Sequence, residues 1–425
     1  MSRPVAMQCL RCGTRYAPQV ARSGCAACTG KLASNLRVVY DPQEVPGWRF
    51  KNKHAMPPGM WRYGEMLPVP TDQAVTLGEG GTPLHLARRM GELLGLKRLY
   101  IKDESCNPTH SYKDRLSAVA VSHARAQGAS VVATASSGNA GASLAAYAAR
   151  AGLQCVVASM KGASGPMMAQ IRKYGAHLVM MDDKSLRWPL LAEGAARHGW
   201  YVTSPHAAPV VGSTAVGIEG YKTIAYEIVG DLGSAPDWVV MPVCYGDALA
   251  GIAQGFEDLL CAGEIDKRPR LVAAEAHGSL VNAMAHQTDC VDAVDAEYAT
   301  LAASVGANQS TYQALHWLRM SDGLAVQIGN EGLIDMQELV ACREGLLYEL
   351  ASVMPFVAAR QLARSGVMRE DDTVVCLATA SGLKDTDKST GSWNPLPVVT
   401  VGREQIPELA SATHNLLSQR GGSVR

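Results

Sequence analysis

The 425-residue chain has little charge, little phenylalanine and no long apolar run. Only 18% of its residues are charged, and 39 basic residues balance 39 acidic ones. A net charge of zero leaves no electrostatic footprint for nucleic acid or for an anionic membrane, so neither is expected as a partner. No run approaches the roughly 18 apolar residues that indicate a transmembrane helix. With 41 glycines and three phenylalanines, the composition is typical of an enzyme with many backbone turns.

Length and cysteine usage add two expectations. At roughly 150 residues per domain, the chain should form two or three domains or subdomains. The stretch from Met1 to Cys9 contains no long apolar segment, so no secretory signal is expected. Eleven cysteines is an odd number, which without such a signal fits a reducing, cytoplasmic compartment.

Four of the cysteines form two Cys-x-x-Cys pairs near the start of the chain. Cys9 and Cys12 are followed, after twelve residues, by Cys25 and Cys28. Four soft thiolates on two tight turns suit a tetrahedral Zn²⁺, and four protein ligands would make the metal structural. A segment this small cannot bury a core, so the metal would supply its folding energy. Four free cysteines in a tail are the alternative.

Beyond about residue 70, short β-branched runs alternate with alanine-rich helical stretches. Strands are predicted at residues 99–101, 131–134, 155–158, 177–180, 238–241, 271–274 and 374–378. Helices are predicted at residues 114–126, 140–151, 167–174, 186–198, 217–229, 248–262 and 354–364. Strands separated by helices form parallel sheets that bind ligands at the carboxyl ends of the strands. No Gly-x-Gly-x-x-Gly follows a strand, so a dinucleotide site is not expected.

A lysine begins the helix that follows the first predicted strand. In the segment from Asn107 to Arg115, a polar turn leads into an apolar helix, and Lys113 lies in the first turn of that helix. The positive end of the helix dipole should depress the pKa of this lysine and favour the neutral amine, which Schiff-base chemistry needs. A surface lysine in a first helical turn is the alternative.

Three more strand-to-helix turns are rich in small or polar residues. The first turn consists of Ser136, Ser137, Gly138 and Asn139 and is able to hold a carboxylate. The alternative is an ordinary helix cap, which uses the same residue types. A second is suited to a phosphate and consists of Cys244, Tyr245, Gly246, Asp247 and Ala248. The third begins at Thr379, after the last predicted strand.

Together these segments resemble the threonine synthase family of pyridoxal-phosphate (PLP) enzymes of fold type II. Motifs in the family's order lie at residues 77–84, 107–115, 135–141, 218–225, 345–352 and 379–385. The resemblance covers nearly the whole chain and implies a two-lobed α/β fold with parallel sheets flanked by helices. It also implies a zinc-ribbon-like segment at residues 1–40 and a PLP-dependent catalytic body of two α/β subdomains at residues 41–425. The smaller lobe would span roughly residues 120–215, and the remainder would form the larger lobe.

The resemblance implies roles for residues in each turn. Lys113 would bind PLP and act as base and acid at the substrate Cα. Asn139 would donate a hydrogen bond to the phenolate oxygen of the ring, and Thr379 would face the pyridine nitrogen. The cofactor phosphate would lie on Cys244, Tyr245, Gly246, Asp247 and Ala248. The substrate would contact His110, Ser111, Ser136, Ser137 and Gly138.

The sequence departs from the family pattern mainly at expected substrate contacts. The phosphate turn has lost two glycines and both asparagines, and Asp247 adds a negative charge. An arginine of the family becomes Gly217, two hydroxyl residues become Ala140 and Gly141, and a glycine becomes His110. His110 is either a proton relay or substrate contact, or an exposed loop histidine. The family substrate, O-phosphohomoserine, is therefore open to question.

The leading hypothesis is a PLP-dependent lyase acting on an amino acid with a leaving group at Cβ or Cγ, with threonine synthase the best single activity. The first alternative is a paralogous lyase or β-replacement synthase, cysteate-synthase-like or ammonia-lyase-like. The second is a zinc-ribbon binding module that has lost catalysis. The presence of Lys113, Asn139 and Thr379 counts against this last hypothesis. A homodimer is expected because family members are usually dimers.

Overall fold

The computed structural model describes residues 4–18, 24–40, 59–390 and 402–420. Residues up to Thr386 belong to one compact unit, and the chain from Asp387 onward belongs to a second one. The second unit contains α14 (Ile406–Arg420), and α13 (Thr386–Thr390) spans the boundary. Among the described residues, no helix has the length and apolar character needed to cross a membrane.

The largest sheet of the first unit has six strands. All its neighbours pair in parallel except β4, which is antiparallel to β5. Its order is β12 (Leu324–Gln327), β11 (Arg270–Glu275), β10 (Trp238–Pro242), β13 (Thr373–Ala378), β5 (Arg98–Asp103) and β4 (Leu84–Leu86). The central strands β10 and β13 are buried nearly throughout. This explains their continuous β-branched runs, since a parallel strand covered on both faces has no solvent side.

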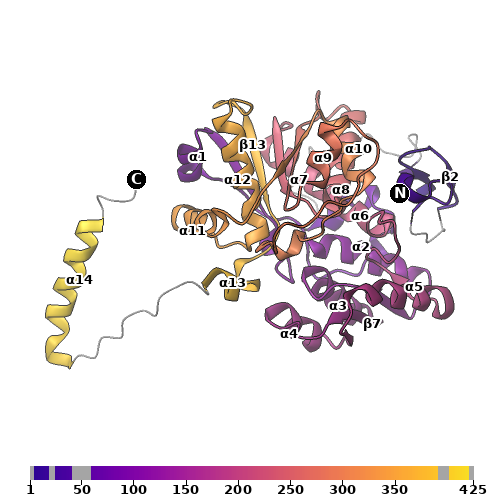
Figure 1. Ribbon diagram of the computed structural model, residues 1–425, viewed down its shortest axis with the longest axis horizontal. Helices are drawn as coiled ribbons and strands as arrows, with labels where there is room; N and C mark the ends of the chain where they lie inside the picture. Colours follow the sequence, from indigo (N-terminus) through magenta and orange to yellow (C-terminus); the bar gives the residue numbers. More distant parts are fainter. Residues whose placement is uncertain (1–3, 19–23, 41–58, 391–401, 421–425) are drawn as a thin grey trace. The chain divides into compact units, whose positions relative to one another are not determined.

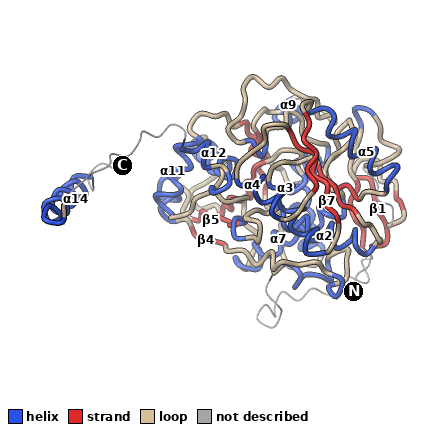
Figure 2. Tube along the Cα trace, turned by 90° about the horizontal axis from the view of Figure 1, so that it is seen from below, coloured by secondary structure: helices blue, strands red, loops and turns tan. Residues whose placement is uncertain are grey.

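A second parallel sheet has four strands. Its order is β8 (His177–Met181), β7 (Gln154–Met160), β6 (Val131–Thr134) and β9 (Tyr201–Val202). In Figure 1, α3, α4 and α5 gather around β7, away from α12 and β13. Figure 2 likewise places β7 apart from β4 and β5. The parallel sheets with flanking helices confirm the predicted α/β class, while the division into two lobes stays a prediction.

The helices that follow the strands complete the layers. They are α1 (Arg88–Leu94), α2 (Lys113–Ala126), α3 (Asn139–Ala151), α4 (Pro166–Lys173), α5 (Arg187–His198), α6 (Ala215–Ile218), α7 (Lys222–Leu232), α8 (Asp247–Cys261), α9 (Ser279–Ala285), α10 (Tyr312–Met320), α11 (Leu333–Glu344) and α12 (Leu350–Arg364). Each of the seven predicted strands overlaps an observed strand, and each of the seven predicted helices overlaps an observed helix.

The N-terminal segment forms a small antiparallel sheet of its own. Its order is β2 (Arg15–Tyr16), β1 (Pro4–Cys9) and β3 (Leu36–Tyr40). The sheet is docked on the body, since the hydroxyl of Tyr40 donates to Glu219 Oε2 at 2.7 Å and the amide of Gln254 donates to the carbonyl of Val38. This small sheet with its cysteine turns, called the ribbon below, therefore belongs to the same compact unit as the two parallel sheets.

A buried ion network holds the start of α2. The guanidinium of Arg115 donates two hydrogen bonds to Glu104, at 2.7 Å each, and two to Glu227, at 2.8 Å each. All three side chains are at most 3% exposed. Glu227 also accepts from Lys102 Nζ at 2.8 Å and from the backbone of Gly81. Burial alone would raise the pKa of Glu227, but the two cations outweigh it and keep the pKa below its usual range.

We expect Arg115→Ala to lower the free energy of unfolding by roughly 3–5 kcal/mol, because it leaves Glu104 buried without a cation and removes one of the two cations that pair with Glu227. The matched control is Lys161→Ala, which removes an ion pair to Asp182 whose partners are 77% and 81% exposed. That pair should contribute less than about 1 kcal/mol. Urea unfolding of both variants compares the two losses, and equal losses would contradict the network's structural role.

Candidate active site

Lys113 lies where α2 begins, beside the end of β13. The backbone N–H of Tyr112 donates to the carbonyl of Thr379 at 2.9 Å, and Ser111 forms an isolated antiparallel bridge with Ala380. These contacts bring the predicted lysine segment and the predicted Thr379 turn together. The Nζ of Lys113 stands 4.6 Å from the centre of the Tyr112 ring.

The expectation that the helix dipole depresses the pKa of Lys113 is wrong. Burial does lower this pKa, but the phenol groups of Tyr112 and Tyr221 and the carboxylate of Asp247 favour the charged form more strongly. The pKa of Lys113 therefore lies well above its usual value. The neighbours facing the ammonium decide its charge, and the sequence did not reveal all of them.

Asn139 begins α3 and lies buried beneath the predicted carboxylate turn. Its Nδ2 donates to Glu349 Oε2 at 2.9 Å, while its Oδ1 is buried without a hydrogen-bond partner. Within the half-buried turn, Ser136 Oγ accepts from the N–H of Gly138. A Cβ at Gly141 would lie 2.0 Å from the carbonyl oxygen of Ser136, so a hydroxyl residue there would push the turn away from the helix.

Gly246 forms the turn between β10 and α8. Its φ is +79°, and a Cβ there would lie 2.3 Å from the Cβ of Ala314, so the position requires glycine. The first N–H groups of α8 have no partner within the helix and form a set of donors suited to an anion. Asp247 does not spoil this site, because its carboxylate accepts hydrogen bonds from Ser213 N and Oγ and from Gln313 Nε2. These hydrogen bonds hold the carboxylate of Asp247 against Ser213 and Gln313.

A serine that sequence reasoning left unassigned orients Thr379. Ser352 Oγ accepts from the N–H groups of Thr379 and Ala380, at 3.0 and 2.9 Å, and lies 2.8 Å from Thr379 Oγ1. Since both lone pairs of Ser352 are used, its own proton must point to Thr379 Oγ1. The hydroxyl proton of Thr379 is then available to another acceptor. The family-like motif at residues 345–352 was the signal that could have revealed Ser352.

Two more buried groups accompany Asn139 and were also missed. Burial, and then the nearby carboxylate of Asp385, raise the pKa of Glu349 to about 7. Burial lowers the pKa of Lys384 to about 8, and its Nζ is buried without a hydrogen-bond partner. Ser111 Oγ, like Asn139 Oδ1 and Lys384 Nζ, is buried without a hydrogen-bond partner. Unpaired buried groups are costly, so several in one place indicate that a polar ligand fits there.

The remaining predicted residues have less specific surroundings. His110 is exposed and has a φ of +63°, in the left-handed region where the family's glycine would be unstrained. Burial raises the pKa of the Cys244 thiol, which suits a packing residue better than a nucleophile. Tyr245 and Ser137 are half-buried, and Ala248 is buried in the first turn of α8.

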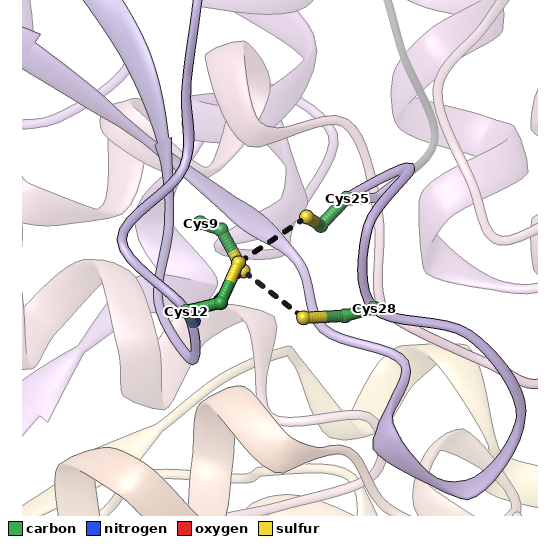
Figure 3. A group of neighbouring side chains, drawn as sticks. All are labelled: Cys9, Cys12, Cys25 and Cys28. Atoms are coloured by element: carbon green, nitrogen blue, oxygen red, sulfur yellow. Dashed lines mark hydrogen bonds between the residues drawn. The ribbon is translucent and has the colours of Figure 1, made fainter.

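The four predicted zinc ligands converge on one point of the ribbon. The Sγ atoms of Cys9, Cys12, Cys25 and Cys28 all lie within 4.8 Å of one another (Figure 3). The Thr14 hydroxyl is the main cause that lowers the pKa of Cys12 to about 6, while burial, followed by the neighbouring thiols, raises the pKa of Cys28 to about 12. Four thiolates cannot form this close together without a cation, and the arrangement fits a tetrahedral Zn²⁺.

Comparison with known proteins identifies the family of the chain. The family profile described as pyridoxal-phosphate dependent enzyme matches residues 75–380. A threonine synthase of Methanocaldococcus jannaschii is 33% identical over 392 residues, which cover 89% of this chain and 93% of the relative. A threonine synthase of Mycobacterium bovis is 34% identical over 342 residues, covering 79% and 92%.

Solved structures show the same fold at lower identity. The processed form of threonine deaminase isoform 2 from Solanum lycopersicum aligns with a TM-score of 0.64 at 18% identity, covering 90% of this chain and 99% of that one. A fungal L-serine ammonia-lyase from Rhizomucor miehei aligns with a TM-score of 0.62 at 18% identity, covering 76% and 100%. The chain belongs to the fold type II family of pyridoxal-phosphate-dependent enzymes, among its threonine-synthase-like lyases.

Proposed function

We propose that this enzyme converts O-phosphohomoserine and water to threonine and phosphate. The threonine synthase relatives support the reaction, as does the position of Lys113 beside Thr379 and near enough to Asp247 of the α8 turn to be influenced by its charge. We further propose a cytoplasmic homodimer, on the strength of the family resemblance and the odd cysteine count.

The residues around Lys113 fit PLP. When bound, PLP stabilises the negative charge that develops at the substrate Cα. Lys113 would hold it covalently, Asn139 and Thr379 would contact the ring, and the first N–H groups of α8 would hold its phosphate. Because Thr379 offers a neutral hydroxyl, the ring nitrogen would stay uncharged, which favours elimination and replacement over transamination.

The substrate's own groups would be held by the neighbouring turns. Ser111 Oγ and the turn from Ser136 to Gly138 offer donors for the substrate carboxylate. Lys113, at the first turn of α2, would remove the proton at the substrate Cα and return it later in the reaction.

Arg187 is the group that favours a phosphorylated substrate. The Nη1 of Arg187 donates to the carbonyl of Ala135 at 3.4 Å, next to the carboxylate turn, and Tyr245 lies near enough to influence its charge. Burial lowers the pKa of Arg187, and among the described residues it has no carboxylate partner. A half-buried guanidinium without a carboxylate partner is suited to a phosphate. It would replace the arginine that the family has at the position of Gly217.

We expect borohydride reduction to fix PLP on Lys113, and Lys113→Ala to lower turnover by roughly 10³-fold or more, because the base at Cα is removed. Release of phosphate and threonine from O-phosphohomoserine is the assay. The control is Lys173→Ala, an exposed lysine of α4. A label on Lys384 instead would refute the assignment of Lys113, and no release of either product would refute the substrate.

We expect Arg187→Met to raise the KM for O-phosphohomoserine by roughly tenfold or more, since a charged hydrogen bond contributes about 1.5–3 kcal/mol. PLP affinity should stay unchanged. Arg197→Met is the matched control on the same helix, where an exposed guanidinium pairs with Glu193. An unchanged KM would contradict the role of Arg187 in binding phosphate. If the enzyme also deaminates serine or threonine, the result favours the ammonia-lyase alternative.

The ribbon should hold about one Zn²⁺ per chain. We expect Cys25→Ser to lose the metal and to unfold the ribbon, because binding energy is folding energy in so small a segment. Cys261→Ser is the control, since this exposed cysteine lies outside the cluster. Metal analysis of the purified proteins measures the outcome, and equal zinc in both variants would exclude this site.

A further inference from the structure

The first turn of α10 lies between the ribbon and the turn proposed to hold the cofactor phosphate. Residues 311–314 make contacts in both directions, although α10 contributes no residue to either predicted site. The ribbon contacts come from Arg11 and Asn35, and the body contacts go to residues 245–247.

On the ribbon side, two contacts reach α10. The guanidinium of Arg11, between the ligand positions Cys9 and Cys12, stacks 3.6 Å from the centre of the Tyr312 ring. Asn35 Nδ2 donates to Gln313 Oε1 at 3.1 Å, and both side chains are 1% exposed. The cysteine turn therefore contacts α10 directly through Arg11.

On the other side, the same turn of α10 fixes the residues that begin α8. Thr311 Oγ1 donates to the carbonyl of Tyr245 at 2.6 Å, and Gln313 Nε2 donates to Asp247 Oδ1 at 2.7 Å. Ala314 lies so close to Gly246 that a Cβ could not be added there. The backbone conformation of the turn is thus set by α10.

The polarity of these amides leaves one arrangement. Asp247 can only accept, so Gln313 must present Nε2 to it and Oε1 to Asn35. Asn35 must then donate through Nδ2, and its Oδ1 accepts from the N–H of Leu36. Asn35 also donates to the carbonyl of Ser213 at 3.1 Å. A Cβ at Gly212 would lie 3.0 Å or less from Asn35, Asp247 and Gln313, so the junction is closely packed.

We propose that the ribbon positions the phosphate-binding turn, with Asn35 as a positioning residue that acts through Gln313. This inference rests on the proposed placement of the PLP phosphate at residues 246–248. The ribbon would then serve cofactor retention without touching the cofactor. Loosening the junction should weaken binding through the phosphate and leave binding through the ring unchanged.

The experiment compares PLP with pyridoxal, which lacks the phosphate, in titrations of the cofactor-free full chain followed by absorbance. We expect Asn35→Ala to raise the dissociation constant for PLP about three- to tenfold and to leave that for pyridoxal unchanged, as for one lost neutral hydrogen bond. Arg11→Ala, which spares the buried junction, should shift the ratio in the same direction. Zinc content and thermal unfolding show whether the ribbon stays folded.

The control within the ribbon is Arg37→Ala, which removes the hydrogen bonds from the guanidinium to Gln8 on the neighbouring strand β1 and leaves the contacts of Arg11 and Asn35 with α10 in place. It should leave both constants unchanged. Gly246→Ala separates the two proposals. If it weakens PLP selectively while Asn35→Ala and Arg11→Ala do not, the phosphate placement stands and the ribbon's role is overturned. If none of the three changes the ratio, both proposals fail.

Discussion

The site depends on the double ion pair that Arg115 makes with Glu104 and Glu227. Arg115 is two residues beyond Lys113, while Glu104 follows β5 and Glu227 lies on α7. One guanidinium therefore fixes the direction in which α2 leaves its turn, and all three charged side chains are shielded from solvent. A buried network of this kind contributes little net stability compared with apolar packing, but it admits one geometry. That geometry places the lysine at the end of β13.

The elements flanking the site could be predicted from the sequence because the central strands are buried on both faces. Residues 238–241 and 374–378 are β-branched runs bounded by turns, and they lie in β10 and β13. The elements without a prediction include the short strands β4, β9 and β12, which are largely half-buried and have no continuous apolar run. The helix α10 was missed too, although it joins the ribbon to the phosphate turn.

Within the site, the residues in loop motifs were easier to predict than their electrostatics. The turns containing Lys113 and Thr379 follow β5 and β13, which are neighbours in one parallel sheet, so their proximity follows from topology. Asn139 follows β6 of the other sheet, and its turn was predicted from its small and polar residues alone. Ser352 and Glu349 lie in the family-like motif at residues 345–352, but that motif alone does not indicate their contacts with Thr379 and Asn139. The charge of Lys113 depends on Tyr221 and Asp247 in the same way, which is why a rule based on the helix dipole alone failed.

Gly217 carries a consequence for how this enzyme could change its substrate. A Cβ there would already lie 3.0 Å from Leu116 and 3.2 Å from Ala120, both on α2. An arginine at this position would have to displace side chains of the helix that carries Lys113. A substitution at Gly217 would therefore act on the lysine helix through packing as well as on phosphate recognition.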